Sequence, residues 1–353
     1  RRFTLAVRSP WPFQAERTVA DLAPGQTLVI DDNLGRDFLP GTAEAEISVG
    51  PLPELGLARL IDSLSTYPYG CVEQTVSKAA PLLAARALRP ALGLGPEPAV
   101  ATVGLQDSVR RLVDLQNAGG GFGLWTPSSP VETWLSAYVG DFLLRAREQG
   151  IHVPLRPFDQ LAQRLALAFS ADDASPAGLQ ARAYAAYVLA KLGRLDAATL
   201  RWFEGRYLAG LPSDLARAQL AAAIAATGDR PRGEMVAASL NGVRQADTAL
   251  MDYGSELRDA AGSLALLLEA GLIAPDERDR RLSQIAAAYG DPGTLDTQSQ
   301  AWLLRAGASL LQDRSAEIGI RLDGRPVAGP LHLVQAIGPS MAPLRIEHGG
   351  TCR

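Results

Sequence analysis

The chain has 353 residues, of which 47% are hydrophobic and 20% charged, with a formal net charge of −4 and a pI near 5.5. This balance is ordinary for a globular protein and excludes an intrinsically disordered chain. The length allows one large domain or two of ordinary size. The acidic charge argues against a nucleic-acid-binding surface, which is normally basic. No apolar run is long enough to span a membrane.

Both ends of the chain are predicted to be β structure. In residues 1–50, "FTLAVRS" and "AEISVG" alternate between apolar and polar residues, as half-buried strands do. In residues 314–353, "AEIGIRLDG" predicts a strand that ends in a turn at Asp323-Gly324, and "LHLVQAI" and "PLRIEHGG" predict two more strands. Neither end has enough strands to be stable alone, so we expect the two to pair into one small β domain.

The middle of the chain, residues 51–313, is rich in Ala and Leu with helical periodicity. About a dozen helical segments are joined by short loops, which is typical of helix arrays. Several of them end in a glycine near a basic residue, a normal helix stop signal: Gly150, Gly193, Gly228 and Gly271. The pattern predicts a mostly α fold, either an open solenoid or a closed α/α toroid, inserted in a small β-sandwich.

One short stretch, "STYPYGCVEQTVSK", carries candidate chemistry. Cys71 directly precedes a predicted helix, so helix-start N–H groups and the helix dipole are expected to favour its thiolate. Gly70 just before it permits a sharp turn. Gln74 lies three positions along and therefore on the same helix face. A nucleophilic sulfur beside a carboxamide can expel ammonia and leave a Cys–Gln thioester, an acyl group stored at high energy. The spacing alone also fits a cysteine that is simply packed in the core.

The full string "YPYGCVEQT" resembles the thioester signature Gly-Cys-Xaa-Glu-Gln of the alpha-2-macroglobulin and complement family, in its bacterial form. "GGGFGLW" (Gly119 to Trp125) and "ETWLSAYV" (Glu132 to Val139) are also similar to stretches of that family. The resemblance covers nearly the whole chain. It implies an α/α-toroid thioester domain, residues 51–313, inserted in a CUB-type β domain formed by residues 1–50 and 314–353, the latter part expected to be truncated.

For the site, the resemblance implies a bond between Cys71 Sγ and the Gln74 side-chain carbonyl, without a metal or cofactor. Glu73 matches the family glutamate, with a solvated acid at a helix start as its alternative. The supporting residues are Gly70 and Glu73, and the residues expected to shield the bond from water are Tyr67 and Tyr69.

One departure concerns histidine. Family members that favour hydroxyl targets use a histidine further along the toroid, and the matching stretch near Arg182 to Tyr184 has none. The three histidines, His152, His332 and His348, are expected to be surface or hydrogen-bonded residues. The sequence therefore predicts direct attack by amines, with weak transfer to hydroxyl groups.

The resemblance implies a single-use protease inhibitor rather than an enzyme. Its expected partners are proteases, as covalent targets, and other macroglobulin domains of a longer parent chain, from which this sequence is expected to be a piece. The expected location is the bacterial periplasm, with the parent anchored by lipid. A Cys71–Cys352 disulfide is conceivable, but we expect Cys352 to be exposed.

Two alternatives stay open. The first is an α/α-toroid enzyme such as a cyclase or glycosidase, because "DLQNAGGGFGLW" resembles cyclase repeats. Such an enzyme needs acidic clusters, and the adjacent acids Asp172-Asp173 lie in a predicted loop. The second is an interaction module in which Cys71 has no chemistry.

Overall fold

We analysed a computed structural model of the chain. It describes residues 22–39, 41–49, 70–91, 99–241, 251–288, 295–313, 318–327, 331–338 and 341–351, together with the single positions 16, 18, 20, 57 and 60. Tyr67, Tyr69, Cys352 and the strand predicted at "FTLAVRS" lie outside these residues.

Helices make up most of the described chain. The α-helices are α2 (Val72–Ala91), α3 (Ala99–Leu115), α4 (Thr133–Glu148), α5 (Leu155–Ser170), α6 (Pro176–Lys191), α7 (Ala197–Tyr207), α8 (Asp214–Ala226), α9 (Arg230–Ala238), α10 (Glu256–Glu269), α11 (Pro275–Ala288) and α12 (Thr297–Asp313). Two short 3₁₀ helices, η1 (Asp32–Gly35) and η3 (Leu208–Gly210), complete the set in these residues.

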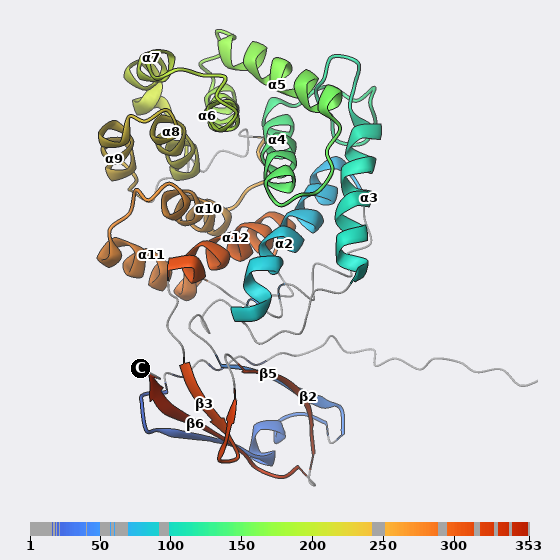
Figure 1. The fold of residues 1–353 in the computed structure, drawn as a ribbon, viewed down its shortest axis with the longest axis vertical. Coiled ribbons are helices and arrows are strands. Elements are labelled where there is room, and N and C mark those ends of the chain that lie inside the picture. Colours follow the sequence, from blue (N-terminus) through green and yellow to red (C-terminus); the bar gives the residue numbers. More distant parts are fainter. Residues whose placement is uncertain are drawn as a thin grey trace, which may run out of the picture.

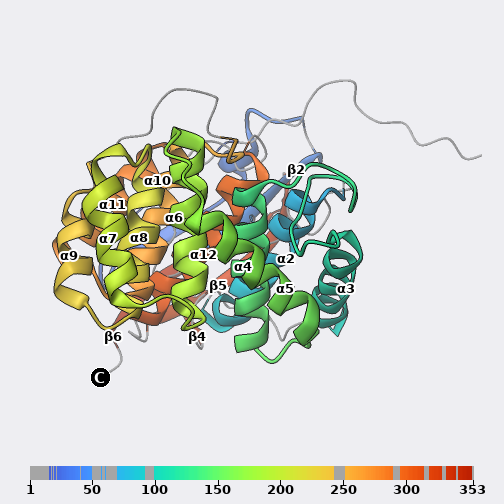
Figure 2. The same cartoon turned by 90° about the horizontal axis from the view of Figure 1, so that it is seen from above.

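The helices form a closed double ring. Helix α2 contacts α4, and the series continues through α6, α8, α10 and α12, which returns to α2. The odd-numbered helices pack outside this inner ring, with α3 on α2, α5 on α4 and α6, α7 and α9 on α8, and α11 on α10. Figure 1 shows the inner helices around the ring centre, and Figure 2 shows α9 and α3 at opposite sides of the ring. Because α12 contacts α2, the helices form a closed toroid and not an open solenoid.

Local sequence explains the helix ends. Ser175, Asp196, Ser213 and Ser255 each cap a helix by accepting a hydrogen bond from a backbone N–H of its first turn. The glycines predicted to stop helices adopt the left-handed conformation that favours glycine. Their φ angles are +80° at Gly150, +67° at Gly193, +90° at Gly228 and +63° at Gly271.

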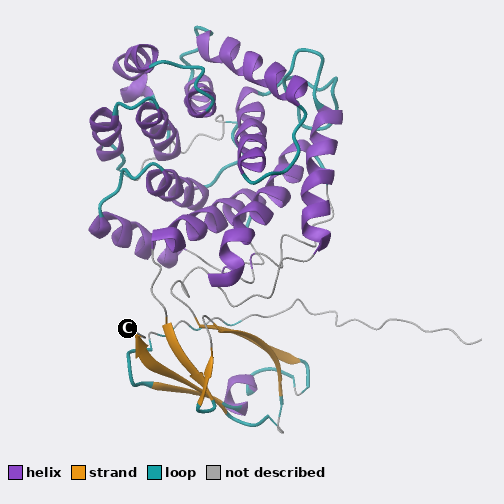
Figure 3. Ribbon diagram, in the orientation of Figure 1, coloured by secondary structure: helices purple, strands orange, loops and turns teal. Residues whose placement is uncertain are grey.

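The two ends of the chain form a β unit of two small sheets (Figure 3). Its strands are β1 (Thr27–Ile30), β2 (Ala43–Val49), β3 (Ile318–Leu322), β4 (Arg325–Val327), β5 (Leu331–Ile337) and β6 (Leu344–Thr351). The sheet order is β1-β6-β3-β4 in one and β2-β5 in the other. Strands from the first fifty residues thus pair with strands from the last forty in both sheets, with Thr27 opposite Glu347 and Ala43 opposite Ile337.

A shared apolar core joins the two sheets, with Ile47 from β2 and Ile320 and Ile346 from the other sheet. The predicted turn at Asp323-Gly324 connects β3 to β4, and both residues have positive φ, +48° and +75°. This is the two-residue hairpin turn that matches strand twist. The mostly α fold with a small β-sandwich is confirmed, whereas the CUB-type assignment and the three boundaries stay predictions. Among the described residues, no helix combines the length and apolarity needed to cross a membrane.

Candidate functional site: the start of helix α2

Cys71 and Gln74 face each other at the start of α2. The backbone N–H of Gln74 donates to Cys71 Sγ at 3.4 Å, and the backbone N–H of Cys71 donates to Gln74 Oε1 at 3.3 Å. The carbonyl of Cys71 already accepts the first helical bond, from Thr75 N–H at 2.9 Å. Cys71 is therefore the N-cap residue and Gln74 the third helical residue of a reciprocal capping box, with sulfur in the place of the usual hydroxyl. The cap holds the sulfur and the side-chain carbonyl on the same side of one turn.

Two neighbouring segments fix this helix start. The guanidinium of Arg111 on α3 donates twice to the carbonyl of Gly70, at 2.6 and 3.2 Å. The backbone N–H of Val72 donates to the carbonyl of Leu124 at 2.9 Å. A side chain at Gly70 would lie 3.3 Å from Arg111 Nη2, and Gly70 is not among the glycines with positive φ. Gly70 thus leaves room for the close approach of Arg111 and does not form a left-handed turn.

The Cys71 thiol is free and 4% exposed. Burial, the largest influence, raises the pKa of the thiol above its ordinary value. The N–H of Gln74 lowers the pKa in part, as a helix start should, while the charge of Glu73 raises it. The thiol pKa is therefore raised, whereas the sequence predicted that it would be lowered, because burial has a larger effect than the helix start.

Glu73 is buried, so its interpretation as a solvated acid is wrong. Its Oε1 accepts hydrogen bonds from Ser77 Oγ at 2.6 Å, Thr297 Oγ1 at 3.1 Å and Gln298 Nε2 at 3.0 Å. Thr297 and Gln298 open α12, so the carboxylate joins the first turns of α2 and α12, where both helix dipoles favour a negative charge. Glu73 therefore ties the site to the point where the ring closes.

The glycine-rich loop before α4 supports Leu124. The backbone N–H of Asn117 donates to the carbonyl of Gly121, the N–H of Gly121 donates to Asn117 Oδ1, and Gly120 turns the chain with a φ of +82°. A side chain at Gly121 would lie 2.6 Å from Val131, and one at Gly123 would lie 2.5 Å from the carbonyl oxygen of Pro130. The loop therefore needs glycine where it packs against the segment that leads into α4.

A cluster of aromatic rings lies beside the site. Trp134 stacks on Tyr138 with ring centroids 5.3 Å apart, and Tyr138 OH lies 3.0 Å from Ser77 Oγ. Trp134 also contacts Tyr184 at 5.6 Å and Tyr253 at 6.1 Å. Sequence reasoning singled out "ETWLSAYV" but missed Tyr253, which lies far along the chain in a segment without a motif. Tyr67 and Tyr69, the predicted shields, lie outside the described residues.

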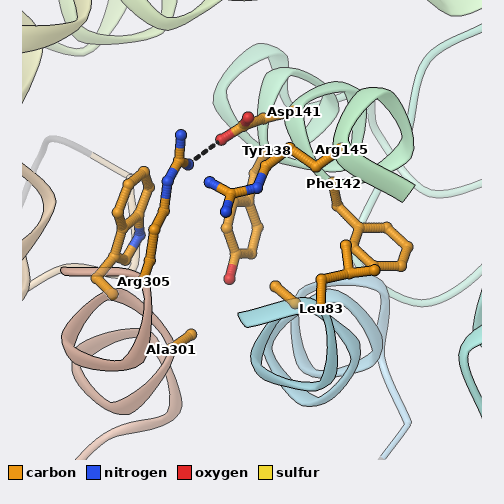
Figure 4. Close-up of a pocket in the computed structure, with 9 residues that line it drawn as sticks. Leu83, Tyr138, Asp141, Phe142, Arg145, Ala301 and Arg305 are labelled. Atoms are coloured by element: carbon orange, nitrogen blue, oxygen red, sulfur yellow. Dashed lines mark hydrogen bonds and ion pairs between the residues drawn. The ribbon is translucent and has the colours of Figure 1, made fainter. Parts of the chain in front are cut away.

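The centre of the ring is filled by charged and aromatic side chains. Asp141 Oδ2 accepts from Arg305 Nη1 at 2.5 Å and from Tyr184 OH at 2.8 Å, as the dashed line to Arg305 in Figure 4 illustrates. The cavity lined by Leu83, Tyr138, Asp141 and Arg305, among others, has a volume of about 20 Å³. Because drug-sized ligands need about 300 Å³ or more, this cavity has room only for about one water molecule. That volume weighs against a cyclase-like substrate site at this place in the ring.

The other polar residues singled out from the sequence lie elsewhere. Asp173 is in an exposed loop, where hydrogen bonds from Ser175 lower the pKa of its carboxyl. His152 is exposed between α4 and α5, while His332 and His348 belong to the β unit. Within the described ranges, no three His, Cys, Asp or Glu side chains gather as a metal-binding group.

The stretch expected to hold a helper histidine in relatives lies in α6. Ala183 has 0% exposure there, so a larger residue at this position would overpack the helix. Its neighbour Tyr184 faces the aromatic cluster.

Comparisons with known proteins agree with this geometry. Residues 47–169 match the family described as the A-macroglobulin TED domain. The chain is 34% identical over 323 residues to the alpha-2-macroglobulin of Escherichia coli strain K12, an alignment that covers 87% of this chain and 19% of that protein. The chain therefore spans about a fifth of the length of this relative.

Solved structures show the same arrangement. Native E. coli alpha-2-macroglobulin, from domain MG7 to the C-terminus, superposes with a TM-score of 0.76 and 31% identity over 93% of this chain and 54% of that one. Salmonella alpha-2-macroglobulin reacted with methylamine gives a TM-score of 0.75 and 31% identity over 93% of this chain and 22% of that one. At this identity and coverage, the likeness extends to both the helical ring and the β unit.

Proposed function

Because the chain belongs to the alpha-2-macroglobulin family as its thioester-domain region, we propose that it is the reactive part of a protease inhibitor, which captures attacking proteases covalently. Cys71 and Gln74 form an internal thioester, and a nucleophile on the protease takes over the acyl group. The observation that carries the proposal is the reciprocal cap, which places Cys71 Sγ and the Gln74 side chain against each other at a buried helix start.

Bond formation consumes the Gln74 amide. The Cys71 sulfur attacks the side-chain carbonyl carbon of Gln74, the C–N bond breaks, and ammonia leaves with the thiol proton. The product is a thioester that closes a small ring across one helical turn. Burial of the site excludes water, which would otherwise hydrolyse the stored acyl group.

In the capture step, the bond between Cys71 and Gln74 is broken and Gln74 is joined to the target. An amine attacks the carbonyl carbon, the C–S bond breaks, and Cys71 leaves as a thiolate that takes up a proton released by the amine. The N–H of Gln74, which already donates to Cys71 Sγ, stabilises the departing sulfur. The amide that forms on Gln74 is stable, so each site acts once and the protein is an acyl donor rather than a catalyst.

Amines are the proposed targets. No histidine stands in the stretch around Ala183, and Tyr184 occupies the adjacent position beside the aromatic cluster. Without an imidazole to accept the acyl group and activate a hydroxyl, we expect surface lysines of a protease to react and alcohols to react poorly. Incubation with equal concentrations of methylamine and glycerol tests this preference, and comparable yields of amide and ester would contradict it.

Intact mass spectrometry of the native protein tests the thioester itself. We expect a mass lower by one ammonia, a Cys71 that does not react with thiol reagents, and addition of methylamine to Gln74 with release of the thiol. The variant C71S cannot form the thioester and should show none of these changes. Native protein with the full calculated mass, a reactive Cys71 and no methylamine uptake would contradict the proposal and favour an interaction module without chemistry.

The wider setting is also proposed from family membership. Residues 1–50 and 314–353 are assigned to a CUB-type β domain and residues 51–313 to the thioester domain, within a longer chain of macroglobulin domains. The parent is placed in the periplasm, anchored by lipid. Cell fractionation with an antibody against this chain tests the location, and recovery in the cytoplasmic fraction would contradict it.

A further inference from the structure

The segment just before α10 holds Tyr253 in an unusual backbone conformation. Met251 and Tyr253 have φ angles of +47° and +53°, in the left-handed region that non-glycine residues rarely adopt. Such a conformation costs about 1–3 kcal/mol per residue and persists only where the surroundings enforce it. The position of Tyr253 is therefore imposed by its neighbours.

Arg258 is the residue that imposes it. Its guanidinium is fully buried and bonds to Asp252 twice, with Nη2 at 2.6 Å from Oδ2 and Nη1 at 3.2 Å from the carbonyl oxygen. Gly254 leaves the space that the guanidinium occupies. The guanidinium also lies over the Trp134 ring, 5.3 Å from its centroid. Arg258 thus holds Asp252, which precedes Tyr253, and packs against Gly254 and against the Trp134 ring that Tyr253 contacts.

Tyr253 contacts the residues at the start of α4. Its hydroxyl donates to Glu132 Oε2, and its ring lies 6.1 Å from Trp134. The backbone N–H of Glu132 donates to Phe122 O at 2.9 Å, in the same loop whose Leu124 carbonyl accepts from Val72 N–H. The partner of the hydroxyl therefore belongs to the backbone network that holds the first residue of α2.

Tyr253 is partly exposed, whereas the Trp134 ring that it contacts is buried. Tyr253 is 37% exposed, whereas Cys71 is 4% and Trp134 is 2% exposed. Burial and the hydrogen bond to Glu132 raise the pKa of the phenol, and the charges of Cys71 and Glu73 raise it further. These charges agree with the contacts above, which link Tyr253 to the start of α2 through Glu132 and through the Trp134–Tyr138 stack.

We propose that Tyr253 is a positioning residue of the thioester site, whose ring, held by Glu132, limits the access of water and small nucleophiles to the Cys71–Gln74 bond. This inference rests on the proposed function. It concerns a residue more than 170 positions from the motif, distinct from the two tyrosines that the sequence predicted as shields.

The test compares four variants of the native protein. Y253A removes the ring, Y253F removes only the hydroxyl, and E132Q weakens the acceptor. W202A is the matched control, because Trp202 is an exposed aromatic residue, 55% exposed, on α7, which lies across the ring from α2 (Figure 1). The measurements are the rates at which the thioester is lost to water and to methylamine, from intact mass, and the midpoint of thermal unfolding.

We expect Y253A to lose the thioester to water about tenfold faster than the wild type, which corresponds to about 1.4 kcal/mol of barrier. Y253F keeps the ring and should lie within about threefold of the wild type, with E132Q between Y253F and the wild type. W202A should match the wild type. If Y253F loses the thioester nearly as slowly as the wild type, and the variants unfold at the same midpoint, then the ring acts by covering the bond and not by supporting the fold.

Peptide mass keeps the test decisive if Y253A is purified without a thioester. Glutamate at position 74 means that the bond formed and was hydrolysed, which supports the inference, whereas glutamine means that it never formed and overturns it. Equal rates of loss in Y253A, W202A and the wild type overturn the inference alone. A wild type that never loses ammonia overturns the proposed function, and this inference with it.

Discussion

Glu269 joins three helices of the inner ring, and its replacement by glutamine should destabilise the protein in a pH-dependent way. The carboxylate, at the end of α10, accepts from Arg305 of α12 at 2.9 and 2.7 Å and from Arg145 of α4 at 3.1 Å. Burial alone would raise the pKa of Glu269, but Arg305 and Arg145 lower it from 4.5 to about 2. The folded state therefore favours the charged form.

The size of the effect follows from the pKa difference. A shift from 4.5 to about 2 corresponds to about 3 kcal/mol of stability, at about 1.4 kcal/mol per pKa unit. Because 28% of the Glu269 side chain is exposed, solvent screens part of the interaction and we expect E269Q to lose about 2–3 kcal/mol near neutral pH. The folded pKa lies below the unfolded one, so this stability is fully present above about pH 4.5 and is lost as the pH falls toward about 2.

Denaturant unfolding followed by helical circular dichroism measures the difference. We expect E269Q and the wild type to differ by about 2–3 kcal/mol at about pH 7 and to converge as the pH approaches about 2. E148Q is the control, because Glu148 is 51% exposed and 3.7 Å from Lys191, and it should change stability by less than about 1 kcal/mol. A loss in E269Q that stays the same at both pH values would refute the electrostatic explanation and point to packing.

Two further predictions concern the thioester site. G123A should destabilise the protein by about 1–3 kcal/mol and reduce the fraction with a thioester, because the new methyl group would lie 2.5 Å from Pro130 O. G119A, with its methyl 3.5 Å from the nearest atom, should leave both unfolding and intact mass unchanged, and equal losses would contradict this explanation. E73Q removes a charge that raises the pKa of the Cys71 thiol, so in protein without a thioester, alkylation of Cys71 should accelerate at lower pH than in the wild type. An unchanged or higher thiol pKa would contradict this expectation.

Local features of the sequence predicted much of the fold. Helical periodicity gave the ring helices, and the four stop glycines end helices because left-handed backbone is strained for any side chain. Asp323-Gly324 forms the hairpin turn that its chemistry favours. Such features depend on a few consecutive residues, and short-range physics therefore decides them.

Features that depend on distant contacts could not be predicted in this way. Closure of the ring depends on α12 returning to α2, and residue periodicity is the same in an open solenoid. The burial of Glu73 depends on Thr297 and Gln298, which no pattern near residue 73 reveals. The net direction of the Cys71 pKa required the depth of burial, because the helix start and burial act in opposite directions. Tyr253 carries no sequence signal at all, since its role follows from the conformation of its segment.

The helix cap explains the order of residues in Cys-Val-Glu-Gln. An N-cap residue and the third helical residue exchange hydrogen bonds, so Cys71 and Gln74 are held together by one turn of α2 itself. Of the two residues between them, Glu73 bonds to the first turn of α12. One turn therefore contains both the reacting pair and the contact that closes the ring. The carboxylate that raises the pKa of the Cys71 thiol is therefore the same one that joins α2 to α12.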